Sequence, residues 1–395
     1  MPFSRNIDVD IDTGSWGRKA VPAWIGTNGV QSVNVTNALL LLGALTTPHA
    51  LSAGSPERYW ACVRYFSALT STNDLRIQSA FLDLDPHQKG ILSDDFGVAI
   101  STQWLSDRMG GFARISDGRK FAINNGLKKS ASNIAKVGPG KCPDFVVTDR
   151  SGKFHVLECK GTQIGERSRD KAMENGLPQK RGIAFGRHVL GERLVAGLSL
   201  VGEASNAKTS LRIVDPVFAP VSEVPNGDAP RARDILSRLM MASALNLAGF
   251  PRTAFEMSWP TGFAADATVI PYLTKFEKEG LSQSRPERTA TLRQEIATEV
   301  RTRPPRGQNF VVREVRLEIP AIEIEPGVVA TTVFLRRGVN AQTILQLGQN
   351  NLDFQDVLDD QTPRGASAVV EFANEPAKAR LSFADKFFTE MEFLI

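Results

Sequence analysis

The feature that most constrains the fold of this chain is a pair of short apolar runs, residues 145–147 and 154–157. Asp149, Ser151 and Gly152 lie between the runs, and residues of these types favour turns. Two apolar runs separated by such a turn predict two paired β-strands. The pattern therefore predicts a β-hairpin over residues 145–157 of the 395-residue chain.

Charged residues stand at neighbouring ends of the two predicted strands. Asp144 directly precedes the first run, and Glu158, Cys159 and Lys160 directly follow the second. Residues two apart on a strand share a face, so Glu158 and Lys160 point the same way and Cys159 points into the packing. When the strands pair, Asp144, Glu158 and Lys160 can converge. Two carboxylates can hold a hard divalent cation, and an ammonium beside them can orient or polarise a water molecule.

The same residues also have a purely structural interpretation. Glu158 and Lys160 could form a solvated ion pair on an edge strand, worth less than about 1 kcal/mol, with Asp144 as a turn residue after Pro143. Against this interpretation, Glu158 directly follows an apolar run, and Cys159 is of a type that is usually buried. The pattern favours a chemical site.

Pro143-Asp144 followed by Glu158-Cys159-Lys160-Gly161 resembles the PD-(D/E)xK signature of the restriction-endonuclease-like nuclease superfamily. The resemblance covers residues 143–161 and identifies no subfamily. It implies an α/β (α+β) fold in which a mixed sheet is flanked by helices. It also implies a magnesium ion, or manganese in its place, on the two acids, and cleavage of DNA or, less often, RNA.

The resemblance also implies roles for single residues. Asp144 and Glu158, with the backbone carbonyl of Cys159, would bind the metal, and Lys160 would position the attacking water. The products would carry a 5′-phosphate and a 3′-hydroxyl. The expected function is a metal-dependent nuclease, with DNA as the favoured substrate, in prokaryotic restriction or anti-phage defence in the cytoplasm. The rival hypothesis is a non-catalytic nucleic-acid-binding or assembly subunit built on the same fold.

A third acidic ligand from a preceding helix often accompanies this signature. Apolar residues recur at helical spacing from Phe96 to Trp104, and Ser93 or Asp94 can cap the start of such a helix. Asp95 is the favoured third metal ligand, with Asp94 close behind. The alternative is that both acids only cap the helix and complement its dipole.

A basic segment follows the second predicted strand. Residues 160–195 hold eight basic and four acidic residues, a net charge of +4 that equals the net charge of the whole chain. Phosphates held by this segment would lie near the metal; alternatively, it is a solvated helix with pairs at helical spacing. We expect a helix over residues 166–175 that ends at Gly176 and Pro178. The candidate nucleic-acid contacts are Arg167, Arg169, Lys171, Lys180 and Arg181, with Gln163 as a further candidate in the loop before the helix.

Composition sets the broad class. A hydrophobic fraction of 42% and a charged fraction of 23% are typical of a globular protein. Three cysteines at no metal-ligand spacing predict a reduced protein. The longest apolar run, residues 38–45, is too short to span a bilayer, so no membrane partner is expected. The sequence leaves open whether the chain forms a homo-oligomer or binds a partner subunit.

Patterning divides the chain into three expected parts. Residues 1–80 form a mostly helical N-terminal region, with helices over 33–45 and 56–69, and residues 81–219 form the nuclease core, with later strands over 194–201 and 210–214. A linker rich in proline over 218–231 leads to residues 232–395, a C-terminal α+β domain with a helix over 234–247. Alternating runs at 311–319, 322–325 and 328–335 predict an antiparallel sheet there. That domain is either a substrate- or partner-recognition module or a plain scaffold.

Overall fold

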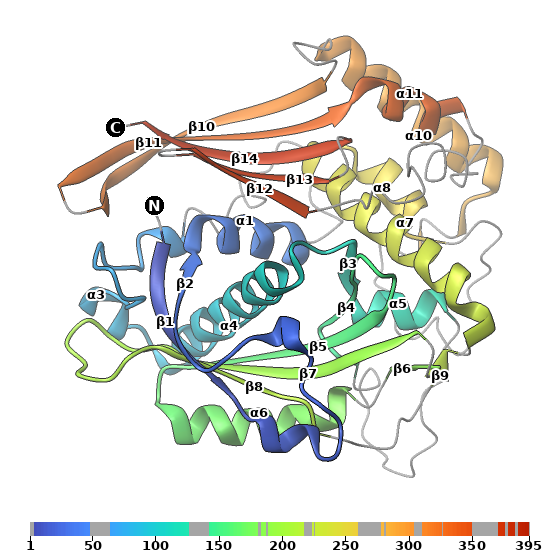
Figure 1. Ribbon diagram of the computed structural model, residues 1–395. Helices are drawn as coiled ribbons and strands as arrows, with labels where there is room; N and C mark the ends of the chain where they lie inside the picture. The colour runs from blue at the N-terminus through green and yellow to red at the C-terminus, as the bar shows by residue number, and fades with distance from the viewer. Residues whose placement is uncertain are drawn as a thin grey trace.

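The structure is a computed structural model, and its described residues form two large β-sheets with helices between and around them, and one small two-stranded sheet (Figure 1). It describes residues 4–47, 64–125, 142–180, 183–186, 189–216, 223–224, 226–259, 278–279, 282–303, 310–325, 327–349, 370–375, 378–383 and 386–394. Among the helices in these ranges, none is both long enough and apolar enough to cross a membrane.

The first sheet has seven strands in the order β2-β1-β8-β7-β5-β4-β3. Their bounds are β1 Ser4–Ile11, β2 Gly29–Asn34, β3 Arg114–Asp117, β4 Phe145–Thr148, β5 Phe154–Thr162, β7 Leu190–Ser199 and β8 Ser210–Val214. The pairs β1/β8 and β5/β7 are parallel, and the other neighbours are antiparallel. The sheet is therefore mixed, as predicted.

Helices cover both faces of this sheet. Helix α4 (Pro86–Met109) and helix α6 (Glu166–Lys180) both contact β5 and β7, and Figure 1 places them on opposite sides. Shorter elements join the strands: the helices α3 (Ser79–Leu82) and α5 (Gly118–Asn124), the 3₁₀ turns η1 (Thr13–Trp16), η2 (Ala23–Ile25) and η4 (Asn226–Asp228), and the two-stranded pair β6 (Ala184–Phe185) and β9 (Glu223–Val224). The predicted sheet flanked by helices is confirmed.

The second sheet is antiparallel throughout, as predicted for the C-terminal part. Its strands lie in the order β10 (Phe310–Glu325), β11 (Val328–Asn340), β14 (Phe387–Leu394), β13 (Lys378–Phe383) and β12 (Val370–Glu375). The runs expected at 311–319 and 322–325 are one strand, with register shifts after Glu318 and after Glu323. The C-terminal part of the chain also contains the helices α7 (Ala229–Ala248), α8 (Pro251–Met257), α10 (Arg285–Thr302) and α11 (Ala341–Gln349).

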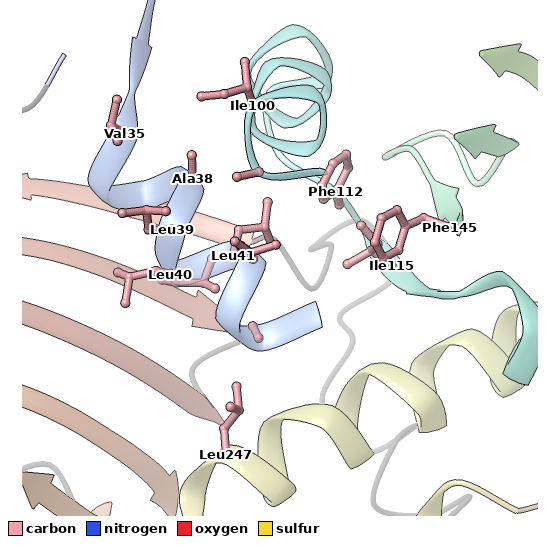
Figure 2. Close-up of a cluster of buried hydrophobic side chains, with 14 of the residues drawn as sticks. Val35, Ala38, Leu39, Leu40, Leu41, Ile100, Phe112, Ile115, Phe145 and Leu247 are labelled. Atoms are coloured by element: carbon pink, nitrogen blue, oxygen red, sulfur yellow. The ribbon is translucent and has the colours of Figure 1, made fainter. Parts of the chain in front are cut away.

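Helix α1 (Val35–Thr46) joins the two halves. Its sequence is almost wholly apolar, and the Asn34 side chain caps it by accepting from the Asn37 amide at 2.9 Å. A helix that is apolar all round needs burial on every side, and α1 contacts α4 on one side and β13 and β14 on another. Figure 2 shows side chains of α1 such as Leu40 and Leu41 among Ile100 of α4 and Leu247 of α7. The two sheets therefore share one hydrophobic core.

The expected division of the chain needs correction in two places. Residues 1–80 contribute β1 and β2 to the first sheet, where β1 pairs in parallel with β8, so they are not a separate helical region. Ile7, Val9 and Ile11 alternate with polar residues along β1, and this alternation is a strand signal in the sequence itself. The helix expected over 56–69 lies mostly outside the described residues, which show helix only for 64–66.

The boundary near residues 218–231 does not separate two cores. Part of that segment forms β9 and η4, and α7 begins at Ala229. Ile235 and Leu236 of α7 pack with Val146 and Phe154 of the first sheet. The C-terminal part therefore does not begin as an independent unit at residue 232, because its first helix belongs to the core beneath the first sheet.

Two helix limits also differ from the predictions. Helix α4 begins at Pro86, seven residues before Ser93, because the Asp85 side chain accepts from the amides of His87 (2.9 Å) and Gln88 (3.2 Å). Helix α6 continues through Gly176 and Pro178 to Lys180. The first difference places Asp94 and Asp95 inside a helix and not at its start.

Candidate active site

The pairing of β4 with β5 brings Asp144 opposite Glu158. Phe145 pairs with Leu157, and continuing that antiparallel register by one residue pairs Asp144 with Glu158. Two hydrogen bonds tie the residues together: the Cys159 amide donates to Asp144 Oδ2 at 2.8 Å, and the Asp144 amide donates to Glu158 Oε2 at 3.2 Å. The carboxylates of Asp144 and Glu158 therefore lie side by side at the adjoining ends of β4 and β5.

Lys160 completes this group. Its Nζ donates to Glu158 Oε1 in an ion pair. The Glu158 side chain is wholly buried, whereas 23% of the Lys160 side chain is exposed. The predicted convergence of Asp144, Glu158 and Lys160 is thus present, and the ion pair is partly buried, unlike the solvated pair of the structural interpretation.

Helix α4 packs so closely on the end of β5 that the backbones of the two elements are in contact. A Cβ atom added at Gly161 would lie 1.7 Å from the Ser93 carbonyl oxygen, and one added at Gly97 would lie 2.7 Å from the Lys160 carbonyl carbon. Only glycine at both positions permits this approach. The two glycines therefore bring the middle of α4 against the strand that carries Glu158 and Lys160.

This packing selects Asp94, and not Asp95, as the third acid near the site. Asp94 Oδ1 accepts from the Gly161 amide at 3.4 Å. Asp95 Oδ2 instead accepts from the Tyr65 hydroxyl, on another side of the helix. The structure therefore brings Asp94, and not the expected Asp95, next to the end of β5, because adjacent residues on a helix point about 100° apart. The alternative of two capping acids is wrong, since Asp85 is the cap.

Helix α6 covers the opposite side of the same side chains. A Cβ atom at Gly176 would lie 3.0 Å from Lys160 Cε and 3.2 Å from Glu158 Cγ. The absence of a side chain at Gly176 leaves room for Glu158 and Lys160 beneath the helix. Gly176 is thus a contact point inside α6, where the sequence suggested a helix end.

The acids repel one another in this enclosed place. Burial, followed by the charge of Asp144, raises the pKa of Glu158 to about 8. Burial also raises the pKa of Asp144, and the charges of Asp117 and Asp94 add to it. Burial opposes the charged form of Lys160, but Glu158 outweighs it and raises the Lys160 pKa. A divalent cation would relieve the repulsion between the carboxylates, so the charges fit such an ion.

The oxygen atoms that Asp144 and Glu158 offer suit a magnesium ion whose remaining ligands are water or substrate oxygens. Within the described parts of the chain, no three His, Cys, Asp or Glu side chains lie close enough together to hold a metal ion by themselves. Mg²⁺ is commonly held by one or two carboxylates, with waters and substrate phosphates completing its shell. Asp144, Glu158 and the backbone carbonyl of Cys159 match that smaller set.

The predicted phosphate contacts on α6 divide into two groups. Arg167 and Lys171 are exposed. Arg169 is buried, and it donates to Ser210 Oγ at 2.7 Å and to Asp170 Oδ1 at 2.8 Å. Arg169 therefore ties α6 to β8, and its place as a phosphate contact was wrong. Arg181 and the side chain of Lys180 lie outside the described residues.

The Gln163 side chain is half-buried and bonded to α4. Its Nε2 donates to the Lys89 carbonyl at 3.2 Å, and its Oε1 is buried with no hydrogen-bond partner in the described structure. The side chain joins the loop after β5 to the first half of α4. This contact gives Gln163 a structural role that the sequence did not reveal.

Comparison of the chain with models of protein families, with curated proteins and with solved structures found no match.

Proposed function

We propose that the chain is a metal-dependent nuclease that hydrolyses phosphodiester bonds, with DNA as the favoured substrate. The observation that supports this proposal most is the convergence of Asp144, Glu158 and Lys160 at the paired ends of β4 and β5. Two carboxylates with raised pKa values beside an ammonium suit cation binding and the stabilisation of negative charge. The assembly also lies next to a helix with exposed cationic side chains, Arg167 and Lys171.

In this proposal each residue has a separate task. Asp144, Glu158 and the carbonyl of Cys159 would hold one or two Mg²⁺ ions, or Mn²⁺ in their place. When bound, the cation would neutralise phosphate charge and lower the pKa of a water molecule. Lys160 orients that water and stabilises the charge that develops on the phosphate. Asp94 stays outside the direct ligands and holds the Gly161 amide, which fixes the end of β5.

Membership of the PD-(D/E)xK superfamily, with a restriction-endonuclease-like core, is part of this proposal. It is supported by the signature on neighbouring strands of a mixed sheet that helices flank. A role in prokaryotic restriction or anti-phage defence, and a place in the cytoplasm, rest on the resemblance of residues 143–161 alone.

The test compares the purified protein with Asp144→Asn and Lys160→Ala on plasmid and single-stranded substrates in Mg²⁺ or Mn²⁺. Both variants should lose at least about 100-fold in rate, as is usual when a group that stabilises transition-state charge is removed. Glu174→Gln is the matched control, because Glu174 is exposed on the same α6 helix. Equal cleavage by all four proteins would reject the proposal, and end-group analysis of products would identify the bond that is cut.

The rival function is a non-catalytic nucleic-acid-binding or assembly subunit. One observation favours it: Lys160 already pairs with Glu158, so a cation must compete with an ammonium for that carboxylate. Calorimetric titration with Mg²⁺ separates the two functions. A nuclease should bind the ion in a way that Asp144→Asn abolishes, whereas an inert site should give no heat that depends on Asp144.

A further inference from the structure

An apolar side chain projects from the loop that links the proposed catalytic strand to α6. Ile164 is 85% exposed, whereas the other exposed large apolar residues in the described chain range from 40% to 56%. Ile164 follows Lys160 by four residues, so its Cα lies within about 14 Å of the Lys160 Cα. Single exposed apolar residues are common, so the exposure needs support from a second observation.

That second observation is the way in which the loop is held. The Ile164 amide donates to Thr162 Oγ1 at 3.1 Å, and the Thr162 carbonyl accepts from the Leu200 amide at 2.8 Å. On the other side, the Gly165 carbonyl accepts from the Arg169 amide at 3.0 Å. Gly165 has φ +117°, a conformation that side-chain-bearing residues rarely adopt. The backbone is therefore fixed on both sides of a side chain that contacts almost nothing.

Neighbouring contacts extend this arrangement. Gln163 joins the loop to α4 through the Lys89 carbonyl, so the segment is held by α4, by Leu200 just after β7, and by α6. Arg167 and Lys171 are exposed on the helix that begins two residues after Ile164. An apolar tip next to two exposed cations suits a ligand that presents both flat apolar surfaces and phosphates.

We propose that Ile164 packs against the bases of the nucleic acid beside the cleaved phosphate, and that the preferred substrate has bases that are unpaired or easily unstacked. This inference rests on the proposed nuclease function and adds the substrate class to it. An apolar side chain can enter a base step when unstacking costs little, as at a mismatch, a bulge or a single-stranded segment. Arg167 and Lys171 hold the adjoining phosphates, which carry no sequence information.

The experiment measures binding of the full chain to a fully paired DNA duplex, to the same duplex with a two-base bulge, and to the single strand. Binding is measured in EDTA, and cleavage in Mg²⁺. The native protein should prefer the bulged duplex and the single strand by about tenfold over the paired duplex. Ile164→Ala should reduce that preference to less than about threefold, a loss typical of a contact residue at an interface.

Leu345→Ala is the matched control, because Leu345 is 49% exposed on α11, in the other half of the molecule. It should leave the preference unchanged. Urea unfolding of Ile164→Ala should match the native protein, since the side chain is already solvated. If Ile164→Ala keeps the native preference while Asp144→Asn abolishes cleavage, the inference about Ile164 fails and the nuclease proposal stands. If the native protein neither binds nor cleaves any of the three DNAs, both fail.

Discussion

Gly161 lies so close to helix α4 that a Cβ atom on it would come within 1.7 Å of the Ser93 carbonyl oxygen. The contact is with backbone, which cannot swing aside as a side chain can. It also brings Asp94 to the Gly161 amide at 3.4 Å. One glycine thus determines how close α4 comes to the strand that carries Glu158 and Lys160.

Gly161→Ala should destabilise the fold by about 3 kcal/mol, because added atoms in a filled contact force the backbone apart. Urea unfolding followed by circular dichroism measures this. Gly90→Ala is the control, since Gly90 lies in α4 with nothing within 4 Å of its added Cβ. That variant should instead gain about 0.5–1 kcal/mol from helix propensity. Equal unfolding free energies for the two variants would contradict the close packing.

Comparing Asp94→Asn with Asp95→Asn tests which of these two adjacent acids supports the proposed site. Asp94→Asn should weaken Mg²⁺-dependent cleavage about tenfold, because groups that orient metal ligands have effects of this size. Asp95→Asn should leave the rate nearly unchanged and cost about 1 kcal/mol of stability through its bond with Tyr65. Cleavage rates and unfolding free energies of both variants check this. A larger loss of rate in Asp95→Asn than in Asp94→Asn would support Asp95 as the third metal ligand.

Arg169→Ala should act on stability and not on DNA binding. The side chain is 3% exposed and bonds Ser210 and Asp170. Because Asp170 keeps access to water, the loss should be about 2 kcal/mol, below the 3–5 kcal/mol typical of a wholly buried pair. Lys171→Ala should unfold like the native protein and reduce the slope of log binding constant against log salt by about 1. Binding titrations at several salt concentrations separate the two residues.

Asp149 should make stability depend on pH in the acid range. Burial works against its charge, but hydrogen bonds from His155, Ser151 and the Lys153 amide outweigh it and lower its pKa to about 2. An acid with a depressed folded pKa stabilises the fold fully above its unfolded pKa, about 3.9, and loses that contribution as the pH falls toward 2.

The contribution is about 2 kcal/mol at pH 7, and about half of it should be gone at pH 3. Urea unfolding of the native protein and Asp149→Ala between pH 7 and pH 3 measures it. The difference between the two proteins should shrink as the pH falls. A difference that stays constant would mean that the carboxylate charge contributes nothing.

The local part of the site was predictable from sequence, and the part that depends on distant packing was not. The period of two along a strand gives the shared face of Glu158 and Lys160, and the turn residues give the pairing with Asp144. The choice between Asp94 and Asp95 depends on the rotation of α4 about its axis. That rotation follows from contacts at Gly97 and Gly161, which no local pattern encodes.

The same division applies to the fold. The strand over 210–214 was predicted at its observed limits, because its apolar run is bounded by polar residues on both sides. Gly176 and Pro178 predict a helix end, yet α6 continues to Lys180, and Gly176 packs against Lys160 and Glu158. Arg169 looks like its neighbours in the sequence and is buried only because β8 lies beneath it. Tertiary contact overrides local preference in both cases.

The burial of α1 between α4 and the second sheet has a consequence for synthesis of the chain. The strands β13 and β14 that cover one side of α1 emerge more than 300 residues after it. At typical elongation rates, roughly 15–70 s pass between the synthesis of α1 and that of the strands that cover its leucines. A nascent chain of this protein should therefore recruit a holding chaperone until its last strands leave the ribosome.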